Sequence, residues 1–90
     1  MTASDLNIKK GDYITVTEWT NTLMDTNQKD QSYVGDCLEV TATDKNLLRI
    51  NMIRSGGKVL IKTTINLNKV MIRKLSQDFV DTIMNEKTTL

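Results

Sequence analysis

Hydrophobic and polar residues alternate along much of the chain between about residues 12 and 74, and a period of two is typical of β-strands. Turn-forming residues divide this region into five short predicted strands. The first covers residues 13–17, where Ile14 and Val16 share a face. A polar stretch without periodicity follows at residues 19–32. It predicts a long loop with three hydrophobic anchors, Trp19, Leu23 and Met24.

The second and third strands form the predicted centre of the sheet. We expect the second to begin near Tyr33 and to bend at Gly35-Asp36, because Asp36 interrupts a set of apolar residues of one parity. That set is Val34, Leu38, Val40 and Ala42. A tight turn at residues 44–46 leads into the third strand. Its inward face is expected to carry Leu48, Ile50 and Met52, and its outward face Leu47, Arg49 and Asn51.

Two adjacent glycines, Gly56 and Gly57, permit positive φ angles and predict a hairpin turn before the fourth strand. Alternation in that strand predicts two faces. The inward residues would be Val59, Ile61, Thr63 and Ile65, and the outward ones Lys58, Leu60, Lys62 and Thr64. A turn at residues 66–68 would then lead to a short fifth strand at residues 70–73.

The period changes after residue 74, where Phe79, Val80, Ile83 and Met84 form one helical stripe. This predicts an α-helix over about residues 76–86, with Ser76 as its N-cap and Phe79 in the core. The helix is expected to pack over an open end of the sheet. Together, the patterns predict a mainly β fold: a strongly bent, five-stranded small β-barrel with a C-terminal α-helix. Ninety residues suit a single domain spanning residues 1–90.

Charge changes this picture because it is distributed unevenly. Residues 1–44 carry eight acidic and three basic residues, a net charge of −5, and residues 75–90 have a net charge of −2. Residues 45–74 carry eight basic residues and no acidic one. These are Lys45, Arg49, Arg54, Lys58, Lys62, Lys69, Arg73 and Lys74. The total of +1 therefore hides a strongly polarised chain.

Three explanations of the basic segment stay open. Arg49, Lys58 and Lys62 have outward parity on adjacent strands and would form a strip for nucleic-acid phosphates. Alternatively, the basic half of one copy meets the acidic half of another, which favours head-to-tail association. In the third explanation, the charges neutralise one another within the fold.

The composition argues against catalysis and against metal binding. The chain has no histidine, which is the usual proton shuttle and the commonest metal ligand. Its single cysteine, Cys37, suits packing in a strand and a reducing compartment. We therefore expect no enzyme activity, no cofactor and no metal. We also expect a cytoplasmic protein, because the sequence offers neither a signal peptide nor a membrane span.

Two short segments resemble the sequence motifs of the Sm-like (LSm) family of small β-barrels. Gly35, Leu38 and Asn46-Leu47-Leu48 stand in the order of the first motif, and Met71-Ile72-Arg73-Lys74 is similar to the end of the second. The chain departs from the family in several features: Gly35 lies one residue farther from Leu38 than usual, the first loop is far longer, and the helix follows the sheet instead of preceding it. Two motif positions also differ. Ala42 occupies the usual acidic position, and Lys74 replaces the glycine that normally follows the arginine.

The Sm-like resemblance implies a homo-oligomeric ring, joined head-to-tail by pairing of edge strands, with single-stranded RNA bound near the pore. It makes Asn46 the candidate for base contact and Arg73 the partner of a phosphate or base edge. Together with the basic segment, the candidate nucleic-acid-binding residues are Asn46, Arg49, Lys58, Lys62, Arg73 and Lys74. The residues themselves leave two alternatives open: a left-handed turn position for Asn46 and a solvated strand-end charge for Arg73.

A second class of function keeps a similar fold. In an SH3-like interaction module, the long loop at residues 19–32 would bind a peptide or another protein, without nucleic acid. The Asn-, Thr- and Lys-rich composition without proline would suit a small phage protein. The few aromatic residues offer little base stacking, although Trp19 and Tyr33 are candidates for it.

Overall fold

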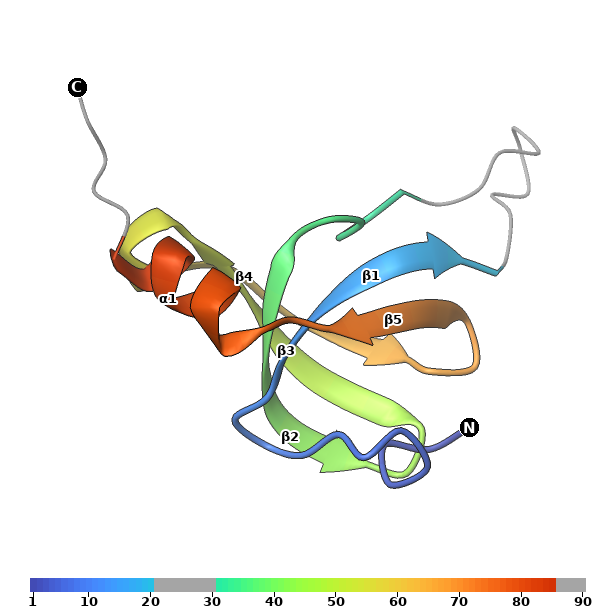
Figure 1. Ribbon diagram of the computed structural model, residues 1–90. Coiled ribbons are helices and arrows are strands. Elements are labelled where there is room, and N and C mark those ends of the chain that lie inside the picture. The colour runs from blue at the N-terminus through green and yellow to red at the C-terminus, as the bar shows by residue number, and fades with distance from the viewer. Residues whose placement is uncertain (21–30, 86–90) are drawn as a thin grey trace.

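The computed structural model describes residues 1–20 and 31–85. It contains five strands, one 3₁₀ turn and one helix (Figure 1). In chain order these are β1 Tyr13–Trp19, β2 Cys37–Asp44, β3 Leu47–Arg54, η1 Ser55–Gly57, β4 Lys58–Asn66, β5 Val70–Lys74 and α1 Gln77–Asn85. The strands form one antiparallel sheet in the order β4-β3-β2-β1-β5. The predicted mainly β fold with a C-terminal helix is confirmed.

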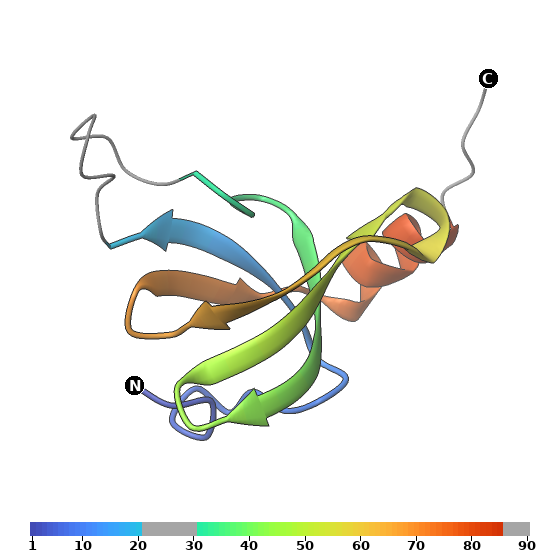
Figure 2. The same cartoon turned by 180° about the vertical axis from the view of Figure 1, so that it is seen from behind.

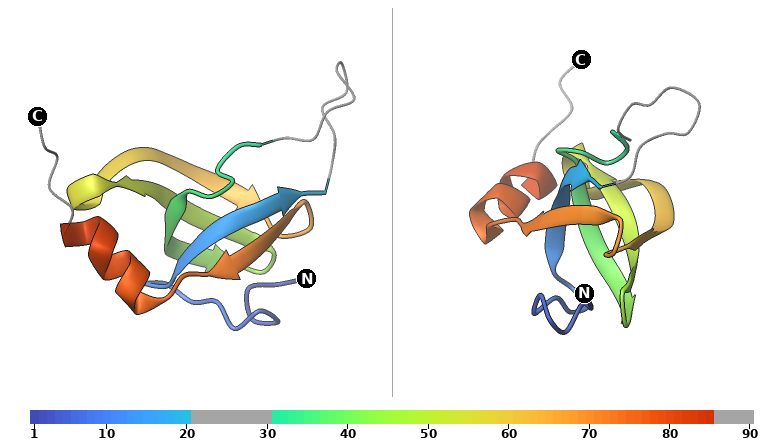
Figure 3. Two further views of the ribbon diagram at one scale, coloured as in Figure 1. Left: turned by 45° about the horizontal axis from the view of Figure 1, so that its top comes forward. Right: turned by 90° about the vertical axis from the view of Figure 1, so that its right-hand side faces the viewer.

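The sheet curls around a hydrophobic core on its inner face (Figure 3). Four of the predicted inward residues of the first two strands are buried there, namely Ile14, Val16, Leu38 and Val40. Val34, which alternation places on the same face, is only partly buried against the core. Leu48, Ile50 and Met52 of β3 are also buried, as their alternation predicts. Side chains that alternate across each strand therefore separate an inner apolar face from an outer polar one.

The register of the described sheet shifts at three β-bulges, and two of them, in β2 and in β4, change the face that alternation predicts. In β2 the register shifts between Val40 and Ala42, so Ala42 pairs with the outward Arg49. The prediction that Ala42 shares the parity of Val40 is therefore wrong, because Thr41 is an extra residue in the strand. The second strand also begins at Cys37, not near Tyr33.

The second bulge lies in β4 at Leu60. Ile61 pairs with Met52 and Val59 pairs with Ile53, so one residue of β4 has no direct partner across the ladder. The predicted inward set is correct for Ile65, which is 2% exposed, but wrong for Val59 and Ile61, which are 44% and 40% exposed. The first half of β4 therefore extends beyond the core and exposes a run of apolar residues.

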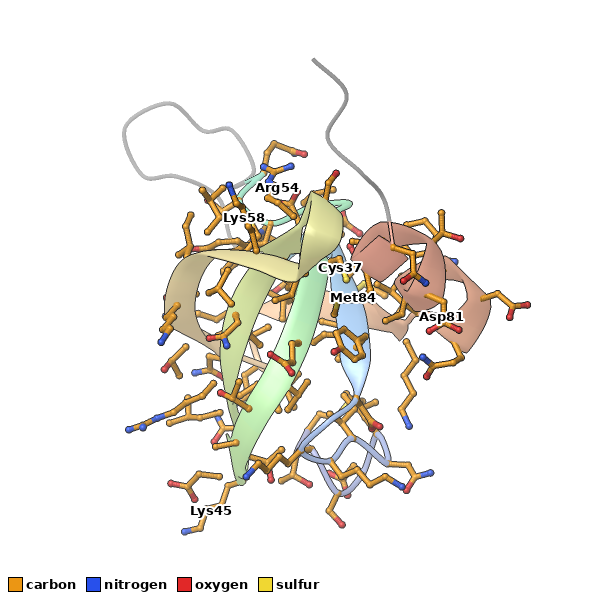
Figure 4. The ribbon with its side chains drawn as sticks, turned by 90° about the vertical axis from the view of Figure 1, so that its left-hand side faces the viewer. Cys37, Lys45, Arg54, Lys58, Asp81 and Met84 are labelled. Atoms are coloured by element: carbon orange, nitrogen blue, oxygen red, sulfur yellow. The ribbon has the colours of Figure 1, made fainter. Side chains whose placement is uncertain are left out.

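Helix α1 packs beside the tip of the β3–β4 hairpin, at one end of the sheet (Figures 1 and 4). Its first turn is capped as predicted, because the Ser76 hydroxyl accepts a hydrogen bond from the Phe79 amide at 3.2 Å. Val80 is buried, whereas Phe79 is 48% exposed. The prediction that Phe79 lies in the core is wrong. The buried face of the helix is narrower than the predicted stripe of Phe79, Val80, Ile83 and Met84, and it leaves Phe79 outside.

The N-terminal segment covers the opposite end of the sheet. Ala3 and Ile8 belong to the core, and the Ala3 amide donates to the Lys45 carbonyl at 2.8 Å. Only Leu6 and Ile8 stand out as anchors in the sequence, so the burial of Ala3 is a structural finding.

Strands β4 and β5 are the two edges of the described sheet, and no ladder joins them. The sheet is consequently not closed in the part of the chain that the structure describes, and a closed barrel stays a prediction. No helix among residues 1–20 and 31–85 is long and apolar enough to cross a membrane.

Candidate nucleic-acid interface

A groove of about 390 Å³ lies on the outer face of the sheet, over β3 and β4. Arg49 and Lys62 line it from adjacent strands. The polar residues Thr41, Asn51 and Thr64 also line it. Arg49 pairs across the ladder with Thr64, and Asn51 pairs with Lys62, so the two cations are diagonal neighbours.

Both cations of this groove are available to a ligand. Arg49 and Lys62 are exposed, and neither forms an ion pair with another described residue. The Thr41 hydroxyl donates to the Arg49 carbonyl at 3.3 Å, which braces the backbone beside the guanidinium. An anion in the groove would therefore meet two unpaired cations and nearby hydroxyl and amide donors.

The groove is bordered on the β2 side by an acidic residue. Glu39 stands between Tyr13 and Asn51 in the register and accepts a hydrogen bond from the Asn51 amide at 3.4 Å. Burial, and then the negative charge of Glu39, raise the pKa of the Tyr13 phenol above its ordinary value. The acidic Glu39 thus stands on the β2 side of the groove, whereas the cations Arg49 and Lys62 stand on β3 and β4.

A smaller, more apolar pocket of about 180 Å³ adjoins the groove and shares Arg49 and Thr64 with it. Ala42 and Leu47 supply its apolar lining, and Asp44 supplies a carboxylate. The bulge at Thr41 is what brings Ala42 to this face. The two hollows together offer a cationic surface next to an apolar one.

The candidate base-contacting residue, Asn46, has a structural role in this fold. Its side-chain amide donates to the Asn66 side chain at 2.8 Å, and its carbonyl accepts from the Leu67 amide at 2.8 Å. These bonds tie the β2–β3 turn to the β4–β5 turn. The left-handed residue of this turn is Lys45, with φ of 55°, so the alternative that put Asn46 there is wrong.

The other candidate cations do not join Arg49 and Lys62. Lys58 stands at the hairpin, opposite Arg54 (Figure 4). Arg73 is exposed on β5, at the far edge of the sheet order. Lys74 is engaged by the N-terminal segment, because its ammonium donates to the Asn7 carbonyl and lies 3.5 Å from the Asp12 carboxylate.

Parity in the sequence identifies part of this groove. Asn51 and Thr64 have the same outward parity as Arg49 and Lys62, so they are detectable as neighbours once the hairpin is recognised. Thr41 has this outward parity too, because Val40 and Ala42 on either side of it are expected inward. The residue that alternation places wrongly is Ala42, which the bulge at Thr41 brings to this face without a local signal in the sequence.

The two aromatic candidates for base stacking pack against the core instead. Trp19 and Tyr33 are partly buried against it. The Trp19 indole also donates to the Ser32 carbonyl at 2.7 Å and so fixes the end of the long loop, as its predicted anchoring role requires. The other predicted anchors, Leu23 and Met24, lie outside the described residues, as does the middle of the 19–32 segment to which the SH3-like alternative assigns binding.

The described residues do not bring together side chains that suit metal binding or nucleophilic chemistry. No cluster of three or more His, Cys, Asp or Glu residues occurs in the described part of the chain. Cys37 is buried, and its burial followed by the charge of Glu39 raises the pKa of the thiol. Cys37 lines a hollow together with Ile53 of β3 and Ile83 of α1, which is the environment of a packing residue.

The described residues form a small antiparallel β protein in which no ladder closes the sheet, with a groove on the outer face of β3 and β4 that is lined by two cations. Comparison with protein-family models, curated proteins and solved structures finds no match to this chain.

Proposed function

We propose that this chain is a non-catalytic binding protein that holds single-stranded RNA along the outer face of β3 and β4. The observation that carries the proposal is the groove in which Arg49 and Lys62 stand without ion-pair partners among the described residues. Phosphate contacts of this kind supply affinity without reading sequence. The adjoining apolar pocket at Leu47 would take part of a base or ribose.

Within this proposal the small-barrel, Sm-like architecture is retained as the working hypothesis. Five antiparallel strands and a terminal helix are compatible with it. The proposal transfers the main role from Asn46 and Arg73 to Arg49 and Lys62. The reason is that the Asn46 side chain already bonds to Asn66. Arg73 lies on β5, at the edge of the sheet opposite to β4.

The test is a fluorescence titration of a labelled oligouridylate of about 12 nucleotides, a length within the range that small β domains cover. It compares the wild type with the double variant Arg49→Ala/Lys62→Ala. A matched control, Lys45→Ala/Lys69→Ala, removes the same charge from the turns. Each lost phosphate contact should lower the slope of log K against log salt by about 0.7, so the groove variant should lose about 1.4.

The groove variant should also bind at least about tenfold more weakly at low salt, with a smaller effect in the control. Absence of binding by the wild type at about 50 mM salt would overturn the proposal. So would an equal loss in both double variants, since that would report total charge instead of a defined groove.

Self-association is the second candidate function. One observation favours it: β4 and β5 are both unpaired edges in the described sheet, and each exposes an apolar side chain, Leu60 at 58% and Met71 at 55%. Head-to-tail pairing of these edges would build the expected ring. Light scattering across a concentration series tests it, and a concentration-independent monomer mass would exclude it.

A further inference from the structure

The first half of β4 is an edge that is both apolar and cationic. Val59, Leu60 and Ile61 are 44%, 58% and 40% exposed, and Lys58 and Lys62 flank them. β4 pairs only with β3 in the described sheet, so the backbone groups on its other side join no ladder there. Figure 2 shows β4 running from the hairpin beside α1 to the turn that precedes β5. Edges are usually protected by charged residues or bulges, and this one has both. Neither protection explains three consecutive exposed apolar residues.

We propose that this edge binds an extended, acidic segment of a partner protein, which adds to β4 as a sixth strand. Main-chain hydrogen bonds would supply the binding energy, as in other cases of strand addition. Leu60, at the bulge, would be covered by an apolar side chain of the partner. Acidic residues of the partner would face Lys58 and Lys62. This inference goes beyond the proposed RNA binding and does not depend on it.

Charge distinguishes this partner from a second copy of the chain. Antiparallel pairing of two β4 strands about Leu60 would set Lys58 opposite Lys62, and like charges directly opposite are destabilising. Pairing with β5 would bring the exposed Arg73 to the same edge. Since residues 45–74 contain eight basic residues and no acidic one, either edge of a second copy adds positive charge. An acidic strand has the complementary charge.

Neighbouring elements leave this edge accessible. Ile65, in the second half of β4, is buried against the core, and the run of consecutive exposed residues is residues 58–62. The only ion pair of the hairpin region among the described residues joins Arg54 to Asp36 at 3.9 Å, which leaves Lys58 and Lys62 unpaired. A segment of about five residues is enough to cover the open edge.

The test uses a labelled peptide of alternating valine and glutamate, about eight residues long, which covers the open segment with some excess. One control peptide has lysine in place of glutamate. Another is N-methylated at alternate residues and cannot complete the ladder. We expect the acidic peptide to bind in a salt-sensitive manner, and both control peptides to bind at least about tenfold more weakly.

The protein variant is Leu60→Thr, which keeps the charge and the preference for a strand while removing the apolar contact. It should weaken peptide binding about tenfold and leave RNA binding unchanged. The matched control is Met71→Thr on β5, which should bind the peptide like the wild type. Equal binding of the lysine peptide or no binding of the acidic peptide would overturn the inference. A ring that dissociates in Leu60→Thr would also overturn it, because the edge would then hold a second copy.

Discussion

Ile61 and Ile65 offer a direct test of how much of β4 is covered. Both belong to the same strand and have the parity that alternation assigns to the core, yet Ile61 is 40% exposed and Ile65 is 2% exposed. Replacing isoleucine by alanine removes three carbon atoms, worth about 2.4 kcal/mol when they are fully buried. At Ile65 a cavity adds to this, so we expect Ile65→Ala to lower the free energy of unfolding by about 3–4 kcal/mol.

At Ile61 only roughly 60% of the side chain is covered, and water can enter the space that alanine leaves. We therefore expect Ile61→Ala to cost about 1–1.5 kcal/mol. Urea unfolding followed by circular dichroism measures both values, and each kcal/mol corresponds to a shift of about 4–8 °C in Tm for a domain of this size. The milder pair Ile65→Val and Ile61→Val serves if Ile65→Ala does not fold.

Equal losses at the two positions, within about 0.5 kcal/mol, would refute this account of β4. They would mean that the whole strand is covered, either by closure of the sheet or by another chain. Repeating the measurement over a range of protein concentrations separates these cases, because only association makes stability depend on concentration.

Two further predictions concern Tyr13 and the glycines. Because the Tyr13 pKa is raised by burial and then by Glu39, folding favours the neutral phenol. The stability that this preference contributes is fully present below pH 10.0 and is lost as the pH rises through the pKa of Tyr13 in the folded protein. In urea titrations at alkaline pH, the free energy of unfolding of Tyr13→Phe should therefore fall less with pH than that of the wild type. Gly57→Ala should destabilise more than Gly11→Ala in thermal melts. Both have positive φ, of 81° and 95°, but only the Gly57 substitution would place a Cβ 3.2 Å from the Met84 sulfur, so equal losses would contradict this.

Local signals predict the parts of the fold that depend on local chemistry. The inner face of β3 follows from alternation alone, and the hairpin glycine Gly56 adopts the expected positive φ of 77°. The Ser76 cap is likewise visible in the sequence, because its partner amide lies three residues along the chain. Such features need no knowledge of the other elements.

Long-range contacts account for what the sequence did not predict. Asn46 bonds to Asn66 across 20 residues, and nothing in either turn indicates the other. The bulges at Thr41 and Leu60 are set by how neighbouring strands align, so alternation continued through them assigns the wrong face. Arg49 and Lys62 were predictable as outward cations, but their groove depends on this alignment.

The bulge at Leu60 separates two surfaces on one strand. Residues after it keep the register in which Lys62 and Thr64 point outward beside Arg49, and this builds the groove. At the bulge the ladder slips by one residue, so that Val59 aligns with Ile53 while Ile61 aligns with Met52. The consecutive apolar residues Val59, Leu60 and Ile61 are therefore all exposed along the edge, and none of them is buried in the core. Lys62 lies where the groove and the edge meet, so its charge belongs to both surfaces, whereas Arg49 and Leu60 each belong to one.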